Sequence, residues 1–555
     1  MITDELAGSR LPGSGHLALQ QLLESPHLDA VASPYMYQAI VRNNSRGGPL
    51  TPHGPWDSST ANGKFWLIED DSRTALDAVP GNFKYAQSGA DSENLMRRNV
   101  LTALWHGHGL YFYDLNNQGK FTTYLSAAAT CLSAAHKQSA VACEPWACFD
   151  RLLVSTGYFG QPLRPNVTAA IWNGVSSSIQ AFEDEIRHQG SAPAGGLPVD
   201  PYPDVMVPQI AVFSDETSAA IRTMIPAGDL PMHSNPAYGA FDAMLLGDAL
   251  PVIAASGAAV RAFQLTDLLL PGLEWGHFRI CIFLNAFVVT PEISAAIKTK
   301  LQRPNTTLLW QYAPGLYSSA TGQPDPARVA ELVGIPLRRG DGGIDLLTRL
   351  VQSEAAQDSF NALARRNLQY GHRGCCQQWP KKVDPWFYWS NETQHVHEIV
   401  DVEILGVLEQ ANLSVAAGGL VRAHHRDTGH TVFTAAPGLP VALWRSIAEE
   451  AGVHMYTAYQ ANASSECTAD NEETSLDELT DSVELHGSLL LYHAAATCDG
   501  KVSSRRQVSL PAMATVTDEK QFVVCSNCSR FQTPPMAAGE VALFRVQAVV
   551  ARGST

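Results

Sequence analysis

The chain has 555 residues, 45% of them hydrophobic, and its 38 Lys and Arg against 54 Asp and Glu give a formal net charge of -16. This length allows several domains, each with a core of its own. An acidic field repels nucleic acid and anionic membranes but is indifferent to a neutral ligand such as a sugar, so we expect neither nucleic-acid nor membrane partners. The longest apolar run, 280–289, is too short to cross a bilayer and has the length of a buried strand.

The signals for a cellular compartment disagree. The N-terminal sequence MITDELAGSRLPGSGH has no basic segment followed by an apolar stretch, so no signal peptide is visible. The secretory pathway is instead compatible with ten cysteines and with sequons that begin at Asn43, Asn166, Asn305, Asn391, Asn412, Asn462 and Asn527. The compartment therefore stays open.

Residues 1–190 alternate between helical and strand-like segments. The pattern predicts helices at 17–23 and 93–104, and strands at 28–32, 64–68 and 109–115. A β-α-β-α-β order is typical of a parallel sheet, whose functional sites lie at the carboxyl ends of the strands. Polar residues follow each of the three strands, so we expect a site there.

The sequence predicts two further domains. After a Pro- and Gly-rich linker, 205–337 has the pattern of a small doubly wound α/β domain, with strands at 209–214, 279–289 and 306–312 and a helix at 290–301. Thr290, Pro291 and Glu292 give that helix a cap, a first-turn proline and an acid. Residues 338–382 form a mixed connecting region with a helix near 353–367. Short strands dominate 383–555, which predicts a β-sandwich interrupted by a helix at 441–451 and an acidic loop at 465–484.

The segment GKFWLIEDDSRT, residues 63–74, holds the most informative chemistry. An apolar strand ends abruptly in Glu69, Asp70 and Asp71, and Arg73 is close enough to offset their mutual repulsion. A carboxylate at a strand end beside an aromatic such as Trp66 suits glycoside hydrolysis, which in a retaining enzyme needs a nucleophile and an acid/base carboxyl about 5 Å apart. Acids that merely decorate the N-terminus of a helix are the simpler alternative.

Three blocks resemble glycoside hydrolase family 42 β-galactosidases. They are LALQQLLESPHLDAVASPYMY with GKFWLIEDDSRT and WHGHGLYFYD, then ICIFLNAFVVTPEISAAIKTKLQRPNTTLLWQYAPG, then LPVALWRSIAEEAGVHMYTAY with SLPAMATVTD. The resemblance covers most of the chain, except 338–382. It implies an α/β multidomain protein: the last three strands of a TIM (β/α)8 barrel over 1–190, a flavodoxin-like domain of the kind that forms trimers over 205–337, and a β-sandwich over 383–555.

The same resemblance implies roles for individual residues. The family's nucleophile is a Glu at the end of the seventh barrel strand, which by order corresponds to Glu69. The implied supporting residues are Asp70, Asp71 and Arg73, and the implied lining of the sugar pocket is Tyr35, Trp105 and Asp114. Two sugar-binding candidates come from the residues themselves: Trp66, an aromatic beside the carboxylate, and His106, whose imidazole could bond a sugar hydroxyl. The partner implied is a carbohydrate, and neither a cofactor nor a metal is expected.

The chain departs from the family at the acid/base. In the family this residue is a Glu that follows an Asn at the fourth barrel strand, and it has no counterpart here, because the match begins just before the sixth strand. Removing a general acid costs a factor of roughly 100 to 10,000 in rate. Two functions are therefore expected in parallel: retaining hydrolysis of a β-galactoside or related β-glycoside, or a non-catalytic fragment or degenerate homologue that serves assembly or carbohydrate binding.

Other motifs give weaker signals. Cys525 and Cys528 have CxxC spacing, with Cys467 and Cys498 upstream, but a structural zinc site usually has two tight pairs, so disulfides or unpaired thiols are favoured. The HxH pairs at 106–108 and 395–397 could bind a metal or a sugar hydroxyl, and more often such pairs are structural. Cys281 lies inside a strand rather than at a sharp strand-to-helix turn, which argues against an amidotransferase nucleophile. No phosphate-binding glycine motif is present.

Overall fold

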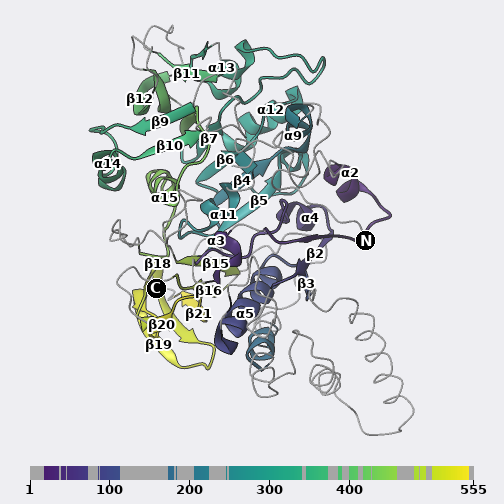
Figure 1. Cartoon of the computed structure of the whole chain (residues 1–555), viewed down its shortest axis with the longest axis vertical. Coiled ribbons are helices and arrows are strands. Elements are labelled where there is room, and N and C mark those ends of the chain that lie inside the picture. Colours follow the sequence, from purple (N-terminus) through teal and green to yellow (C-terminus); the bar gives the residue numbers. More distant parts are fainter. Residues whose placement is uncertain are drawn as a thin grey trace, which may run out of the picture.

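The structure is a computed structural model, and it describes residues 18–36, 39–44, 47–72, 86, 88–112, 173–180, 183, 206–223, 245–246, 249–340, 346–372, 386–390, 399–409, 417–426, 428–458, 481–486, 488–495 and 503–548. These residues form a three-stranded, an eleven-stranded and a five-stranded sheet, with a two-stranded ribbon of β17 (Ser503–Ser504) and β20 (Met536–Ala537) (Figure 1). Within them, no helix combines the length and apolar character that crossing a bilayer requires.

The three-stranded sheet is parallel, in the order β1-β2-β3. Its strands are β1 (Ala30–Pro34), β2 (Phe65–Asp70) and β3 (Gly109–Phe112), and its helices are α2 (Leu19–Glu24), α3 (Ala39–Arg42), α4 (Asp57–Ala61) and α5 (Gly89–Trp105). Helix α5 begins at a capping box in which Ser88 and Asp91 satisfy each other's backbone N–H groups. The predicted alternation of helices and parallel strands is confirmed, whereas closure into a barrel stays a prediction.

The eleven-stranded sheet contains the predicted doubly wound segment as a parallel block in the order β5-β4-β6-β7. The strands are β4 (Ile210–Ser214), β5 (Val260–Gln264), β6 (Ile280–Phe283) and β7 (Thr307–Gln311), and the helices around them are α9 (Glu216–Thr223), α11 (Ala249–Ala254), η4 (Leu265–Leu269), α12 (Pro291–Ala296), η5 (Ile297–Leu301) and α13 (Ala327–Val333). The predicted start of α12 is confirmed: the Thr290 hydroxyl accepts the Ile293 N–H at 3.3 Å, and Pro291 follows the cap.

The sheet does not end where the sequence places its domain boundary. Strand β14 (His430–Thr434) pairs in parallel with β7, and β13 (Gly418–His425), β12 (Ile399–Leu408), β9 (Leu346–Leu350) and β10 (Gln369–His372) continue the sheet in antiparallel fashion. β8 (Leu337–Gly340) and β11 (Trp386–Trp389) pair at its side, and α14 (Asp358–Arg365) and α15 (Val441–Glu450) pack nearby. Residues predicted as connecting region and sandwich thus extend the doubly wound sheet.

The five-stranded sheet has the order β15-β16-β21-β18-β19 and is antiparallel. Its strands are β15 (Ser482–His486), β16 (Leu489–His493), β18 (Gln507–Asp518), β19 (Val523–Gln532) and β21 (Val541–Ala548). One face packs on its own core, and the other contacts α5 through Leu101 and Trp105, which lie against Leu489, Leu491 and Leu543. A helix therefore covers the face on which the predicted sandwich would place a second sheet.

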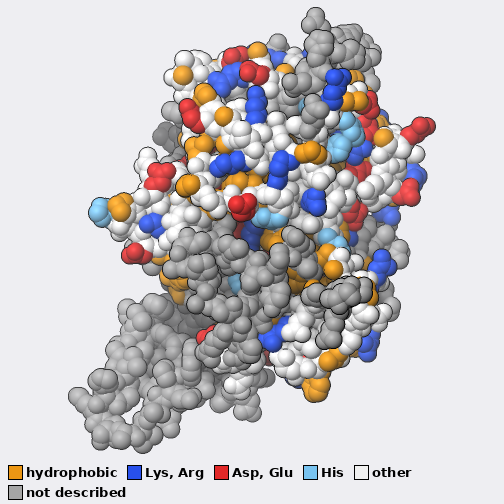
Figure 2. Space-filling view, turned by 180° about the vertical axis from the view of Figure 1, so that it is seen from behind, with side chains coloured by type: hydrophobic (Ala, Val, Ile, Leu, Met, Phe, Trp, Pro, Cys, Tyr) orange, Lys and Arg blue, Asp and Glu red, His pale blue; other side chains and the backbone are white. Residues whose placement is uncertain are grey.

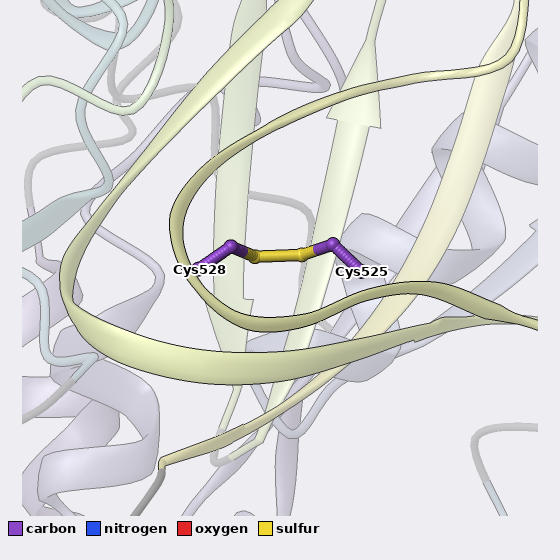
Figure 3. Close-up of a disulfide and its surroundings, with 2 residues drawn as sticks. All are labelled: Cys525 and Cys528. Atoms are coloured by element: carbon purple, nitrogen blue, oxygen red, sulfur yellow. A yellow bond between two sulfur atoms is a disulfide. The ribbon is translucent and has the colours of Figure 1, made fainter.

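The CxxC segment forms a disulfide between Cys525 and Cys528 within β19 (Figure 3). The pairing of β18 with β19 shifts register there, because Ala514 faces Cys528 while Val516 faces Cys525, so the bridge spans an extra residue in β19. Cys281 is a buried free thiol, and burial raises its pKa to about 12. The structure therefore favours a disulfide over zinc at 525–528 and leaves Cys281 unreactive. The other seven cysteines lie outside the described residues.

On the face drawn in Figure 2, acidic, basic and apolar side chains of the described residues are interspersed. The largest exposed apolar side chains of the five-stranded sheet lie on or beside the β18–β19 hairpin: Met513, Phe522 and Val523. Neither observation by itself indicates a ligand.

Candidate active site at the end of strand β2

Glu69 lies on a different face of β2 from its acidic neighbour. Alternation places Trp66, Ile68 and Asp70 on the buried face, while Leu67 and Glu69 are only partly buried on the other. Trp66 and Ile68 belong to the main core, which they share with residues of α2 and α5. Glu69 therefore points to the side of the sheet opposite these helices, at the carboxyl end of a parallel strand.

Tyr111 of β3 is the side chain that reaches Glu69. The two residues are register partners, and the Tyr111 hydroxyl donates a hydrogen bond to Glu69 Oε2. Gly109 shares this face: a Cβ atom there would meet the Phe65 ring at 2.5 Å, so the glycine lets that ring lie across β3. The face thus carries one carboxylate and one phenol above an apolar floor.

Asp70 is held from behind by α5. Its Oδ1 accepts the Ser72 N–H at 2.9 Å, and its Oδ2 accepts from Asn99 Nδ2 at 2.8 Å. The side-chain Oδ1 of Asn99 in turn accepts from Arg98 Nε at 2.9 Å. Burial raises the pKa of Asp70 despite these hydrogen bonds. Asp70 is therefore a support of the strand end, 2% exposed, and not an open ligand for a sugar.

Asp71 is neutralised by Arg42 of α3. The guanidinium forms a buried ion pair with Asp71, donates to the Tyr35 and Met36 carbonyls at 2.6 and 2.9 Å, and lies 3.5 Å from the centre of the Tyr35 ring. The sequence assigned this charge compensation to Arg73, which lies outside the described residues. The compensating cation that the structure shows comes from a helix before the strand.

The predicted aromatic lining is buried. Tyr35 and Trp66 are each 0% exposed: the Tyr35 hydroxyl bonds to Ser72 Oγ, and Trp66 Nε1 donates to Ser33 Oγ at 3.1 Å. Trp105, 1% exposed, packs on the five-stranded sheet. These positions differ from the pocket-lining ones expected from the sequence: Trp66 on β2, Trp105 on α5 and Tyr35 just after β1 all lie in the interior.

The HxH pair at 106–108 is structural. His108 accepts the Trp66 N–H at Nδ1, 3.3 Å away, and its Nε2 lies 3.0 Å from the Trp56 carbonyl, so both ring nitrogens are engaged. Burial lowers the pKa of His108 to about 3, and the ring is neutral. His106, predicted to bind a sugar, is 4% exposed and lies in a cluster with Asp57. Asp114, His395 and His397 lie outside the described residues.

Sequence reasoning missed Tyr111, Asn99 and Arg42. Alternation along 109–115 puts Tyr111 on the same face of its strand as Gly109, but the register that places it beside Glu69 comes from the structure. Asn99 and Arg42 sit inside helical segments, where nothing in the local pattern indicates which acid they face. The structure thus brings Glu69 and Tyr111 together and buries the other described candidates.

No protein-family model and no curated protein matches the chain. Among solved structures, it is similar to the β-galactosidase of the psychrophilic Marinomonas ef1, with a TM-score of 0.47 and 12% identity over 94% of this chain and 61% of that one. For the β-galactosidase of the Antarctic haloarchaeon Halorubrum lacusprofundi the TM-score is 0.41 with 10% identity, over 94% and 64% of the two chains. For a GH42 β-galactosidase from G. stearothermophilus they are 0.40 and 9%, over 69% and 44%. The chain spans less than two thirds of the length of each.

Proposed function

We propose that this protein acts on carbohydrate as a glycoside hydrolase-like protein, and that Glu69 is the nucleophile in retaining hydrolysis of a β-galactoside or related β-glycoside. The observation that carries the proposal is the partly exposed Glu69 carboxylate at the carboxyl end of a parallel strand, hydrogen-bonded by Tyr111. Such strand ends are where α/β proteins place catalytic groups. The motifs around 63–74 and 105–114 support the same choice by their resemblance to family 42.

The reaction needs a second carboxyl group about 5 Å from the nucleophile. Asp70 and Asp71 do not supply it, because both are buried, Asp70 against Asn99 and Asp71 against Arg42. The proposal therefore takes the acid/base from outside the three-stranded sheet.

A homotrimer formed through the doubly wound sheet belongs to the same proposal, and light scattering would test it.

Covalent trapping tests the nucleophile without the acid/base. A 2,4-dinitrophenyl 2-deoxy-2-fluoro-β-galactoside has a leaving group that needs no protonation, and its fluorine slows the second step, so an ester on Glu69 should accumulate. We expect intact-mass analysis to show one added fluorogalactosyl group, and peptide mapping to place it on Glu69.

Two variants serve as matched controls for the trapping. Glu69→Gln should show no adduct, while Glu24→Gln, which changes an exposed acid on α2, should react like the wild type. An unlabelled wild-type chain that is folded by circular dichroism would contradict the nucleophile assignment. An adduct on any residue other than Glu69 would do so as well.

The hydrogen bond from Tyr111 gives a second prediction. Tyr111→Phe removes a donor to a charged acceptor, an interaction that contributes about 1.5–3 kcal/mol. We expect kcat/KM for an activated aryl β-galactoside to fall roughly 10- to 100-fold in a variant that circular dichroism shows to be folded. Unchanged kinetics in a folded variant would show that Tyr111 does not position the nucleophile.

A further inference from the structure

A cluster of charged side chains joins the three main sheets at one point. Asp57 comes from α4 beside the three-stranded sheet, and His106 follows the last residue of α5. Arg261 lies on β5 of the eleven-stranded sheet, and Glu484 lies on β15 of the five-stranded sheet. The side chains of Asp57 and His106 are 1% and 2% exposed, and those of Glu484 and Arg261 are 10% and 17% exposed.

Asp57 is the fixed anion of the cluster. Its Oδ2 accepts the backbone N–H of Ala262 at 2.7 Å, and its Oδ1 lies 3.1 Å from Arg261 Nη1. Burial alone would raise the pKa of Asp57, but His106, Arg261 and these hydrogen bonds outweigh it and lower the pKa to about 2. The carboxylate is therefore charged at every pH at which the protein is expected to work.

His106 lies between two anions and one cation. Its Nδ1 is 2.7 Å from Asp57 Oδ1 and also 2.7 Å from Arg261 Nη1, and its Nε2 is 3.5 Å from Glu484 Oε2. When both nitrogens carry protons, Nδ1 donates to Asp57, and Nε2 faces Glu484 as an ion pair without a hydrogen bond. When Nδ1 is deprotonated, it accepts from Arg261 instead, and the link to Asp57 depends on Arg261 alone.

Four further ionisable side chains lie around the cluster: His108, His277, Asp267 and His486. His108, whose neutral ring lies near His106, and His277, near Arg261, have pKa values lowered by burial to about 3 and about 4. Asp267 of η4 accepts from Asn62 of the α4 segment at 3.1 Å, and burial raises its pKa to about 6. Nδ1 of His486 on β15 donates to the Trp105 carbonyl at 3.1 Å. The pKa values of His108, His277 and Asp267 therefore all lie below 7.

We propose that His106 is a proton-dependent link that ties α4, β5 and β15 together, so that the association of the three sheets weakens when this imidazole loses its proton. The geometry that supports it is the placement of one ring between Asp57 and Glu484, with Arg261 positioned to take over Nδ1. The stacked Trp56 ring, 3.9 Å away, holds the imidazole in this orientation. The link does not depend on the proposed glycosidase function.

The sign of the pH effect follows from the balance of charges. Burial and Arg261 disfavour the charged ring, but Asp57 and Glu484 outweigh them, and the pKa of His106 is raised. A raised pKa means that its contribution to stability is complete below the pKa of unfolded histidine and is lost as the pH rises through the folded pKa. The expected loss therefore lies above about pH 6.5, the ordinary histidine value.

Two measurements on the full chain test the link. The ratio of the folding equilibrium constants of wild type and His106→Gln, from urea unfolding at pH values from 6 to 9, should decrease several-fold as the pH rises. In NMR spectra of the wild type, the imidazole signal assigned to His106 should titrate above the midpoint of a histidine peptide. If His106→Gln does not fold, the wild-type titration alone decides.

If His106 forms this link, its titration midpoint should shift in opposite directions in two variants, which a merely buried histidine would not show. Glu484→Gln removes an anion and should lower the His106 midpoint, whereas Arg261→Gln removes a cation and should raise it. A wild-type midpoint at or below that of the peptide would overturn the proposal. So would midpoints that move in the same direction in both variants.

Discussion

Glu69→Ala should lose hydrolysis of activated aryl β-galactosides by roughly 10,000-fold or more, the scale of effect seen when a covalent nucleophile is removed. The alanine leaves a space at the end of β2 on the partly exposed face, and the Tyr111 hydroxyl loses its acceptor. Steady-state kinetics with a 2,4-dinitrophenyl β-galactoside would measure the loss. The fold should persist, because the core side of β2 is unchanged.

Azide can distinguish a nucleophile from a residue that only shapes the site. In the space left by Glu69→Ala, azide should attack the anomeric carbon from the face that the carboxylate used, so the product should be the α-galactosyl azide and turnover should partly return. A β-azide would indicate that Glu69 is the acid/base of a double displacement. No rescue, together with unchanged activity in Glu69→Ala, would remove Glu69 from the mechanism.

Arg42→Met should destabilise the folded chain by about 3–5 kcal/mol, because it removes the guanidinium that forms a buried ion pair with the Asp71 carboxylate. The substitution also removes the hydrogen bonds to the Tyr35 and Met36 carbonyls. The free energy of unfolding, measured in urea at pH 7, would report the loss. Because Arg42 lies behind the strand end, we also expect the turnover of the remaining folded protein to fall.

Two comparisons make this prediction specific. Arg349→Met breaks an ion pair with Glu409 whose side chains are 40% and 35% exposed, and such a pair contributes only about 0–1 kcal/mol. The double variant Arg42→Met/Asp71→Leu removes the buried carboxylate together with its guanidinium, so part of the lost stability should return. Equal losses for Arg42→Met and Arg349→Met would contradict the assigned role of Arg42.

The sequence predicted elements best where one residue pattern decides the structure. The parallel strands at 65–70 and 109–112, helix α5 and the capped start of α12 all follow from periodicity and end signals. The sequence does not predict which strands share a sheet, because the pairing of β14 with β7 joins residues more than a hundred positions apart. The sequence of a short apolar strand does not indicate which strand it pairs with. The pattern of short strands at β12 to β14 therefore predicts a sandwich, whereas these strands extend the eleven-stranded sheet.

The candidate site shows the same division. Successive side chains of a strand point to opposite faces, so Glu69 and Asp70 lie on different faces of β2. The sequence alone therefore predicts that only one of these two adjacent acids reaches the partly exposed face. The ion pair between Arg42 and Asp71 joins residues 29 positions apart, so it depends on tertiary structure that the local sequence does not indicate. Aromatic residues near a strand end were assigned to a pocket, but Trp66 and Trp105 are large apolar side chains that the core takes up.

Helix α5 packs against both the three-stranded and the five-stranded sheet. Met96 and Val100 pack toward Leu110 of β3, while Leu101 and Trp105 pack on β16 and β21. Neither sheet can therefore be excised with a complete interior: cutting the chain between them would expose one side of α5 whichever piece kept the helix. Heating or proteolysis should accordingly release these two sheets together, as one cooperative unit of unfolding rather than as independent modules.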